Sequence, residues 1–136
     1  MNYLSLLNLD RFLSLQIDIT NACNLTCSHC YHPHHTNHGS LTFLKWKNII
    51  IEYEELLIEL GANPHLIICG GEPLLSPLLP ELIHFISTRS LKYHVSILTN
   101  ATLIHRYDLN SFKLIQNLDF QVSLDGPTEL THDSYR

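Results

Sequence analysis

The sequence of 136 residues has few charged side chains and little glycine or proline. Charged residues make up 15% of it, and 8 Lys and Arg stand against 13 Asp and Glu, for a net charge of −5. The basic residues are scattered, so no basic face for a nucleic-acid backbone is expected. The 5 Gly and 6 Pro exclude a collagen-like or linker composition, and 45% hydrophobic residues exclude intrinsic disorder. This length and composition are typical of one folded domain.

Long hydrophobic runs are missing as well. The best candidate, from Leu74 to Ile86, is broken by Pro77 and Pro80 and falls short of the roughly 18–20 apolar residues that a membrane span needs. The leucine-rich N-terminus has no basic start and no small-residue cleavage site. We therefore expect a cytoplasmic protein without a membrane partner, in a compartment that keeps thiols reduced.

Cysteine is rare but unevenly placed. Cys23, Cys27 and Cys30 follow the spacing C-x3-C-x2-C, and five of the ten His fall between residues 29 and 38. In a reducing compartment such clustering indicates metal binding or catalysis instead of disulfides. Three soft thiolates on one loop can face one metal centre together, and iron–sulfur clusters are held by thiolates. The isolated Cys69 is interpreted as a buried strand residue.

A zinc site is the alternative for the same three cysteines. Structural zinc takes four ligands, usually supplied by C-x2-C or H-x3-H pairs, and the x3 spacing fits that pattern poorly. A Cys3His set would be completed by one of His29, His32, His34 or His35. The histidine-rich stretch from His32 to His38 is otherwise predicted to be a solvated loop.

The predicted elements alternate between strands and helices. Strands are predicted at 12–19, 65–69, 93–98 and 118–124, and helices at 42–60, at 76–90 and within 108–117. Gly61 is expected to end the first helix, and Ser76-Pro77 to begin the second as N-cap and first helical residue. This alternation predicts an α/β fold with a parallel sheet and right-handed crossovers.

Each unusual motif follows a predicted strand. The loop that carries Cys23, Cys27 and Cys30, called the cysteine loop below, follows the first strand. The motifs after the other three strands are Gly70-Gly71-Glu72-Pro73, Thr99-Asn100 and Ser123-Leu124-Asp125-Gly126. In parallel α/β folds the ligand site lies at the carboxyl ends of the strands. We therefore expect the four motifs to converge on one site.

The stretch from Cys23 to Cys30 resembles the cluster loop of the radical S-adenosylmethionine (radical SAM) superfamily. Gly70-Gly71-Glu72-Pro73 is similar to the motif that meets the methionine amino group in that family, and residues 99–102 resemble its third-strand segment. Residues 123–127, with His132-Asp133 and Arg136, resemble the peptide- and protein-modifying (SPASM-like) branch. The resemblance identifies residues 12–136 as the N-terminal portion of a radical SAM core domain, after an N-terminal extension of residues 1–11.

The resemblance implies that Cys23, Cys27 and Cys30 hold a [4Fe–4S] cluster whose open iron takes the amino and carboxylate groups of S-adenosyl-L-methionine (SAM). One electron from an external donor would then cleave SAM to methionine and a 5′-deoxyadenosyl radical, which abstracts hydrogen from a peptide or protein substrate. No catalytic residue beyond the cluster ligands is implied.

The resemblance also implies a set of cofactor-binding residues: His29, Gly70, Gly71, Glu72, Pro73, Asn100, Ser123, Asp125 and Arg136. The glycines let backbone approach a ligand closely, and Pro73 fixes the departing chain. Glu72 either orients its loop or meets the SAM ammonium group, and Arg136 would pair with the SAM carboxylate.

Other members of this set keep simpler alternatives. His29 lies where the family usually places an aromatic residue near adenine, and a surface histidine is the alternative. Asn100, Ser123 and Asp125 would contact ribose and carboxylate groups, and turn formation at strand ends is the alternative for them.

The chain departs from the family in length. The four predicted strands form a truncated version of the partial (β/α) barrel of the radical SAM type, which usually has more βα units. Truncation leaves an unpaired strand edge that is prone to association. We therefore expect a complementing C-terminal segment or partner chain, and the alternative is an inactive fragment.

Overall fold

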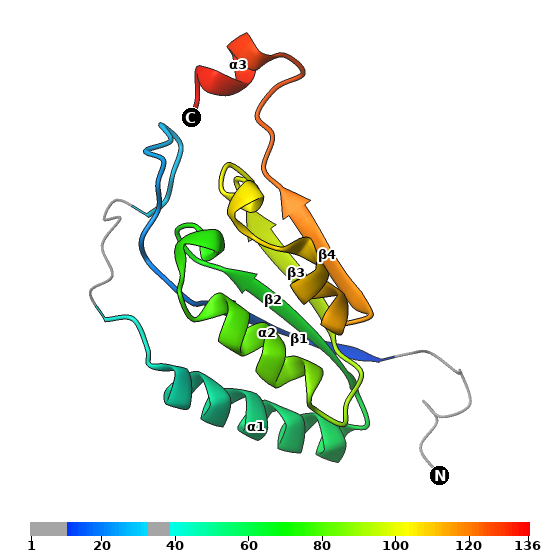
Figure 1. Ribbon diagram of the computed structural model, residues 1–136. Coiled ribbons are helices and arrows are strands. Elements are labelled where there is room, and N and C mark those ends of the chain that lie inside the picture. The colour runs from blue at the N-terminus through cyan, green and yellow to red at the C-terminus, as the bar shows by residue number, and fades with distance from the viewer. Residues whose placement is uncertain (1–10, 33–38) are drawn as a thin grey trace.

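The computed structural model describes residues 11–32 and 39–136. The four strands in this part of the chain form one parallel sheet (Figure 1). Its strands are β1 (Phe12–Asp18), β2 (Asn63–Cys69), β3 (His94–Thr99) and β4 (Asn117–Val122). Each strand pairs in parallel with the next one in sequence, so every connection crosses over the sheet. The predicted α/β fold with a parallel sheet is confirmed. Most of the N-terminal extension and His34, His35 and His38 lie outside the described residues.

The first long helix is α1 (Phe43–Leu60), and both of its ends agree with the sequence prediction. Thr42 is the N-cap, and its side chain accepts a hydrogen bond from Lys45 N. Gly61 ends the helix in the left-handed region at φ 61°, where glycine meets no steric cost, and its N–H donates to Ile58 O. The face buried against the sheet carries Trp46, Ile50, Tyr53 and Leu57.

The second helix, α2 (Leu79–Ser87), begins later than predicted. A 3₁₀ turn, η2 (Pro73–Leu75), precedes it, and Ser76 is extended at ψ 122° where that turn ends. The Ser76 hydroxyl accepts a hydrogen bond from Leu78 N, so it caps the approach to the helix and not the helix itself. Pro80 falls at the second helical position, where its missing N–H costs no hydrogen bond.

The helix expected within 108–117 is a 3₁₀ helix, η4 (Leu109–Leu114), preceded by a shorter one, η3 (Ile104–Arg106). Asp108 Oδ1 accepts a hydrogen bond from Asn110 N at 3.0 Å, and the Ser111 hydroxyl donates to Asp108 O at 2.7 Å. Polar side chains that bond their own backbone favour tight turns over an α-helix. A short helix, α3 (Glu129–Asp133), follows β4, and none of the helices in the described part of the chain is long and apolar enough to span a membrane.

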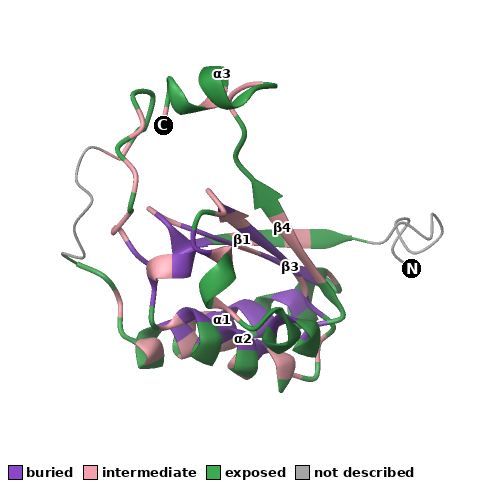
Figure 2. Cartoon of the chain, turned by 45° about the horizontal axis from the view of Figure 1, so that its top comes forward, coloured by how far each residue is buried: buried purple, intermediate pink, exposed green. Residues whose placement is uncertain are grey.

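The hydrophobic core fills the space between the sheet and the two long helices, which lie on the same side of the sheet (Figure 2). Successive side chains of a strand point to opposite faces. Leu66, Ile68, Val95 and Ile97 face the helices and are fully buried. The alternate positions carry mostly polar side chains, such as His65 and Ser96, so one face of the sheet is core and the other is largely polar.

A buried carboxylate ties the two long helices to the sheet. Glu54 of α1 accepts hydrogen bonds from the Arg89 guanidinium, which follows α2, and from the Tyr93 hydroxyl at the start of β3. Burial, together with the nearby Glu54, raises the pKa of Tyr93 and keeps it a donor. The pairing satisfies a charge that would otherwise be costly to bury.

Candidate metal centre

The structure brings the four strand-end motifs together around one cavity of about 230 Å³ at the carboxyl edge of the sheet. All three clustered cysteines line it. Of the predicted cofactor-binding residues, it is also lined by His29, Gly70, Gly71, Asn100, Ser123 and Arg136. Glu72 and Asp125 do not line it but bond the lining residues Asn100 and Arg136, and Pro73 is not part of the lining.

The base of the cysteine loop runs beside the chain that leaves β2. Gly71 N donates to Thr20 O and Glu72 N donates to Ala22 O, both at 2.8 Å. A Cβ on Gly70 would lie 2.2 Å from Thr20 O, and one on Gly71 would lie 2.3 Å from Ala22 O. Both positions therefore exclude any side chain, and Gly70 also has φ +131°, which favours glycine. The close approach that these glycines permit here is to the cysteine loop itself.

Glu72 is 1% exposed and is fully engaged with protein groups. Its Oε1 accepts from Leu74 N and from the Thr99 hydroxyl, and its Oε2 accepts from Asn100 N at 2.8 Å. It thereby caps η2 and fixes the end of β3. Of the two roles predicted for Glu72, this geometry supports orientation of the loop.

The end of β3 holds the cysteine loop from a second direction. Asn100 Nδ2 donates to Asn24 Oδ1 at 3.1 Å, and Asn24 Nδ2 donates to the Thr102 hydroxyl at 2.8 Å. Asn24 stands between the first two cysteines, so these bonds fix the loop where its ligands lie. Asn24 was not among the predicted site residues, because nothing in the sequence marks it apart from its place inside the cysteine motif.

The C-terminal residues hold the cysteine loop from a third direction, and Figure 1 shows that end beside the loop. Ser28 N donates to Tyr135 O at 2.9 Å. Arg136 contacts both Asp125 and Cys27, and His29 Nε2 lies 3.5 Å from Asp125 Oδ1. Three elements therefore fix a loop that has no helix or strand of its own.

Burial shapes the chemistry of the thiols. It raises the pKa of Cys23, although a hydrogen bond from the backbone at Leu25 opposes the shift. Burial also raises the pKa of Cys69 to about 12, helped by the bond that Cys69 Sγ donates to Asp18 Oδ1 at 2.8 Å. Cys69 is 5% exposed, which confirms that it is a buried strand residue, and it lines the cavity as a protonated thiol.

The donor set of this cavity fits an iron–sulfur cluster better than a single ion. Cys23, Cys27 and Cys30 are all free thiols, and thiolates are the ligands of such clusters. Within residues 11–32 and 39–136, no three or more His, Cys, Asp or Glu side chains are gathered tightly enough to hold one metal ion. A four-iron cluster places each thiolate on a different iron, so its ligands need not converge on a point.

The histidines near the cysteines face carboxylates. His29 Nε2 lies 3.5 Å from Asp125 and His32 Nε2 lies 3.8 Å from Asp18. A zinc site needs four donors about 2.0–2.3 Å from one point. Neither histidine completes such a set in this conformation, and His34 and His35 lie outside the described residues.

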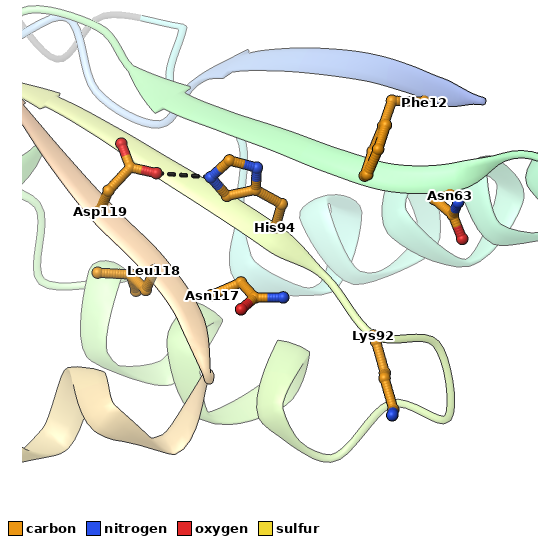
Figure 3. A pocket seen from close by; sticks show the side chains of 7 residues that line it. All are labelled: Phe12, Asn63, Lys92, His94, Asn117, Leu118 and Asp119. Atoms are coloured by element: carbon orange, nitrogen blue, oxygen red, sulfur yellow. Dashed lines mark hydrogen bonds and ion pairs between the residues drawn. The ribbon is translucent and has the colours of Figure 1, made fainter. Parts of the chain in front are cut away.

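A second cavity, of about 510 Å³, lies at the opposite end of the sheet (Figure 3). It is lined by the first residue of every strand, Phe12, Asn63, His94 and Asn117, and by Lys92, Leu118 and Asp119. His94 Nε2 lies 2.6 Å from Asp119 Oδ1. This cavity was not predicted from the sequence, and its lining has no cysteine.

Comparisons with known proteins find relatives over most of the chain. An AdoMet-dependent heme synthase of Oleidesulfovibrio alaskensis is 31% identical over 121 residues, which are 88% of this chain and 29% of that protein. The antilisterial bacteriocin subtilosin biosynthesis protein AlbA of Bacillus subtilis is 30% identical, over 91% of this chain and 27% of its own length. The mycofactocin maturase MftC of Mycobacterium tuberculosis is also 30% identical, over 94% of this chain and 31% of its own length.

The fold has a counterpart among solved structures. The crystal structure of Streptococcus suis SuiB bound to the precursor peptide SuiA superposes with a TM-score of 0.69 at 23% identity, covering 90% of this chain and 27% of that one. The chain spans about a third or less of the length of these relatives. The sequence pattern of the radical SAM superfamily matches residues 17–136. This chain therefore belongs to the radical SAM superfamily.

Proposed function

We propose that the chain binds a [4Fe–4S] cluster through Cys23, Cys27 and Cys30 and cleaves SAM reductively. The observation that carries this proposal is the convergence of three free cysteines with the other strand-end motifs on one cavity. When bound, the cluster would pass one electron to SAM, and cleavage of the sulfonium–C5′ bond would give methionine and a 5′-deoxyadenosyl radical. The contribution of the protein is to position both groups and to exclude water.

The remaining cavity residues are proposed as the SAM site. Asn100 and Ser123 offer polar groups at the ends of β3 and β4, and Gly70 and Gly71 leave backbone open to the cavity. Glu72 and Pro73 act behind this surface, where Glu72 fixes the end of β3. These roles follow from the family resemblance and from the position of each residue.

Three more residues are proposed for the same cofactor: His29 and Arg136, which line the cavity, and Asp125 beside them. His29 offers an imidazole, and its side chain is half exposed. Arg136 retains N–H groups beyond those that meet Asp125 and Cys27, because a guanidinium has five. Asp125 holds the guanidinium in place.

The proposed substrate is a peptide or protein. Two relatives are named for bacteriocin biosynthesis and mycofactocin maturation, and the SuiB structure contains a precursor peptide. A tetrapyrrole is a second candidate, because other relatives are named AdoMet-dependent heme synthases. Both remain proposals, since the chain spans only part of these proteins.

The proposal also includes partners and a compartment. An external donor must supply the electron, and the cytoplasm would keep the four cysteines reduced. β4 pairs only with β3 among the described strands, so its other edge is free for a further strand from a complementing segment or partner chain. The proposal keeps the prediction that residues 12–136 are the first part of a radical SAM core domain.

Anaerobic reconstitution with iron and sulfide, followed by dithionite and SAM, tests this function. We expect a brown chain with close to four irons and four sulfides that forms 5′-deoxyadenosine, measured by liquid chromatography. A folded chain that takes up zinc alone, stays colourless and forms no 5′-deoxyadenosine would instead support the alternative of a zinc module.

A further inference from the structure

The residues that follow β4 fold back onto the middle of the cysteine loop. Ser28 N donates to Tyr135 O at 2.9 Å, and the rings of His29 and Tyr135 meet edge to face with centroids 6.1 Å apart. Ser28 and His29 stand between Cys27 and Cys30. The contact therefore reaches the part of the loop that carries two of the three clustered thiols.

Arg136 is enclosed at this contact, and only 13% of its side chain is exposed. Its Nε donates to Asp125 Oδ2 at 2.5 Å, and its Nη1 donates to Cys27 Sγ at 3.6 Å. A guanidinium is a planar, rigid fork, so a bond at one nitrogen sets the direction of the others. Asp125 thus aims the remaining nitrogens of Arg136 at the sulfur and the cavity.

Asp125 is itself held in place by the short helix α3. Its backbone N–H donates to His132 Nδ1 at 3.2 Å. The next residue is Gly126, where a Cβ would lie 2.3 Å from the Thr131 hydroxyl and 3.2 Å from His132 N. The turn can pack against α3 in this way only with glycine, so the whole arrangement depends on Gly126.

The sign of the charge at this point matters for any cluster bound to Cys27. Among the described residues that line the cavity, Arg136 is the single Arg or Lys side chain. Hydrogen bonds to cluster sulfurs and nearby positive charge stabilise the more negative, reduced state. Arginine stays protonated at every relevant pH, so this effect is constant.

We infer that Arg136, aimed by Asp125, is a positioning residue that donates a hydrogen bond to the Cys27 sulfur and raises the reduction potential of the cluster. The inference rests on the proposed function, because it needs the cluster at this site. It is separate from pairing between Arg136 and the SAM carboxylate, since the effect on the potential is present before SAM binds.

The test compares Arg136→Gln, Arg136→Lys and the control Lys92→Gln, which removes a positive charge at the other end of the sheet. Each chain is reconstituted anaerobically without SAM and held with dithionite and mediators at the potential where half of the wild-type clusters are reduced. Electron paramagnetic resonance (EPR) then measures the reduced fraction. We expect Arg136→Gln to lower the ratio of reduced to oxidised cluster about tenfold, because a bond from a charged donor is stronger to the more negative, reduced cluster.

A tenfold change corresponds to about 59 mV for a one-electron couple. Arg136→Lys should lower the ratio less, because it keeps the charge, and Lys92→Gln should leave it unchanged. An unchanged ratio in Arg136→Gln at wild-type iron content overturns the inference. An equal fall in Lys92→Gln also overturns it, because the effect would then be one of net charge.

Gly126→Ala provides a second variant if Arg136→Gln takes up less iron. It keeps every charge but forces α3, and Arg136 with it, away from the turn at Asp125. We expect a lower reduced fraction, and a wild-type value overturns the inference. A wild-type chain that binds no cluster refutes the proposed function, whereas a cluster that is insensitive to Arg136 refutes only this inference.

Discussion

The two ends of the sheet each carry a cavity, but the polar side chains near the two cavities are satisfied in different ways. At the amino end, side chains bond one another in a chain that crosses all four strands. Its links are Ser14 Oγ to His65 Nδ1 at 2.9 Å, His65 Nε2 to Ser96 Oγ at 3.1 Å, Ser96 Oγ to Asp119 Oδ1 at 3.2 Å and His94 Nε2 to Asp119 Oδ1 at 2.6 Å. His65 and His94 also stack with centroids 4.7 Å apart.

At the carboxyl end, bonds to side chains and to backbone fix the loops around the cavity, and three cysteines line it. Glu72 holds Leu74 N and Asn100 N, while Cys23, Cys27 and Cys30 have free thiols. Polar groups that satisfy one another stabilise strands, whereas groups that fix a loop around several thiols prepare a site for a ligand. We therefore expect the amino end to stabilise the fold and the carboxyl end to bind the ligand.

The largest effect is expected from the cysteines themselves. Cys23→Ala, Cys27→Ala and Cys30→Ala should each abolish nearly all cluster uptake, because each removes one of three thiolate ligands. Cys69→Ala is the matched control, since Cys69 lines the same cavity and bonds Asp18. Iron and sulfide analysis of the four reconstituted chains measures the effect. If Cys69→Ala lost as much iron and sulfide as the other three variants, the assignment of the cluster ligands to Cys23, Cys27 and Cys30 would be contradicted.

The next largest effect is expected at Gly71. A Cβ there would lie 2.3 Å from Ala22 O, so Gly71→Ala must push the cysteine loop away from β2. We expect the free energy of unfolding, measured in urea, to fall by about 2–4 kcal/mol. Most of the cluster uptake should be lost as well. Gly61→Ala, at φ 61° in open space, should cost only about 1 kcal/mol and leave uptake intact. Similar behaviour of both variants would contradict the close packing described here.

A smaller, pH-dependent effect is expected from Cys69. Burial, with the bond to Asp18, raises the pKa of this thiol from 9.0 to about 12. A raised pKa stabilises the fold below pH 9, and this stabilisation is lost as the pH approaches 12. In the metal-free chain, the cost of Cys69→Ala in urea unfolding should therefore fall by about 2–4 kcal/mol over that range. A cost independent of pH would show that the thiol is not held protonated by burial.

The smallest effect is expected at the amino end. Asp119→Asn weakens the contact to His94, but the Asp119 side chain is 46% exposed, so we expect a loss of about 1 kcal/mol or less. Cluster content and 5′-deoxyadenosine formation should not change. A variant that folds normally and yet loses cluster would break the distinction between the two ends of the sheet.

The fold was predictable where local and long-range preferences agree. The buried strands and the helix ended by Gly61 follow directly from hydrophobic periodicity and capping. The connection after β3 was not, because Asp108 and Ser111 bond their own backbone and turn an expected α-helix into a 3₁₀ helix. The helix start predicted at Ser76 was also wrong, because the 3₁₀ turn η2 precedes α2 and Ser76 lies where that turn ends.

The site was predictable as far as it depends on the order of strands. Motifs that follow parallel strands must meet at one edge, which brought the cysteines and Gly70 to one cavity. The bonds from Asn24 to Asn100 and from Cys27 to Arg136 were not predictable, because they join residues 76 and 109 positions apart. The network at the amino end was hidden too, since its members look like ordinary polar strand residues.

The most direct measurement of the central claim is the EPR spectrum of the anaerobically reconstituted and reduced chain, recorded before and after SAM is added. The account predicts the signal of a reduced four-iron cluster whose shape changes with SAM, because one iron has no cysteine ligand. A folded chain with no such signal, or with a signal that SAM leaves unchanged, would contradict it.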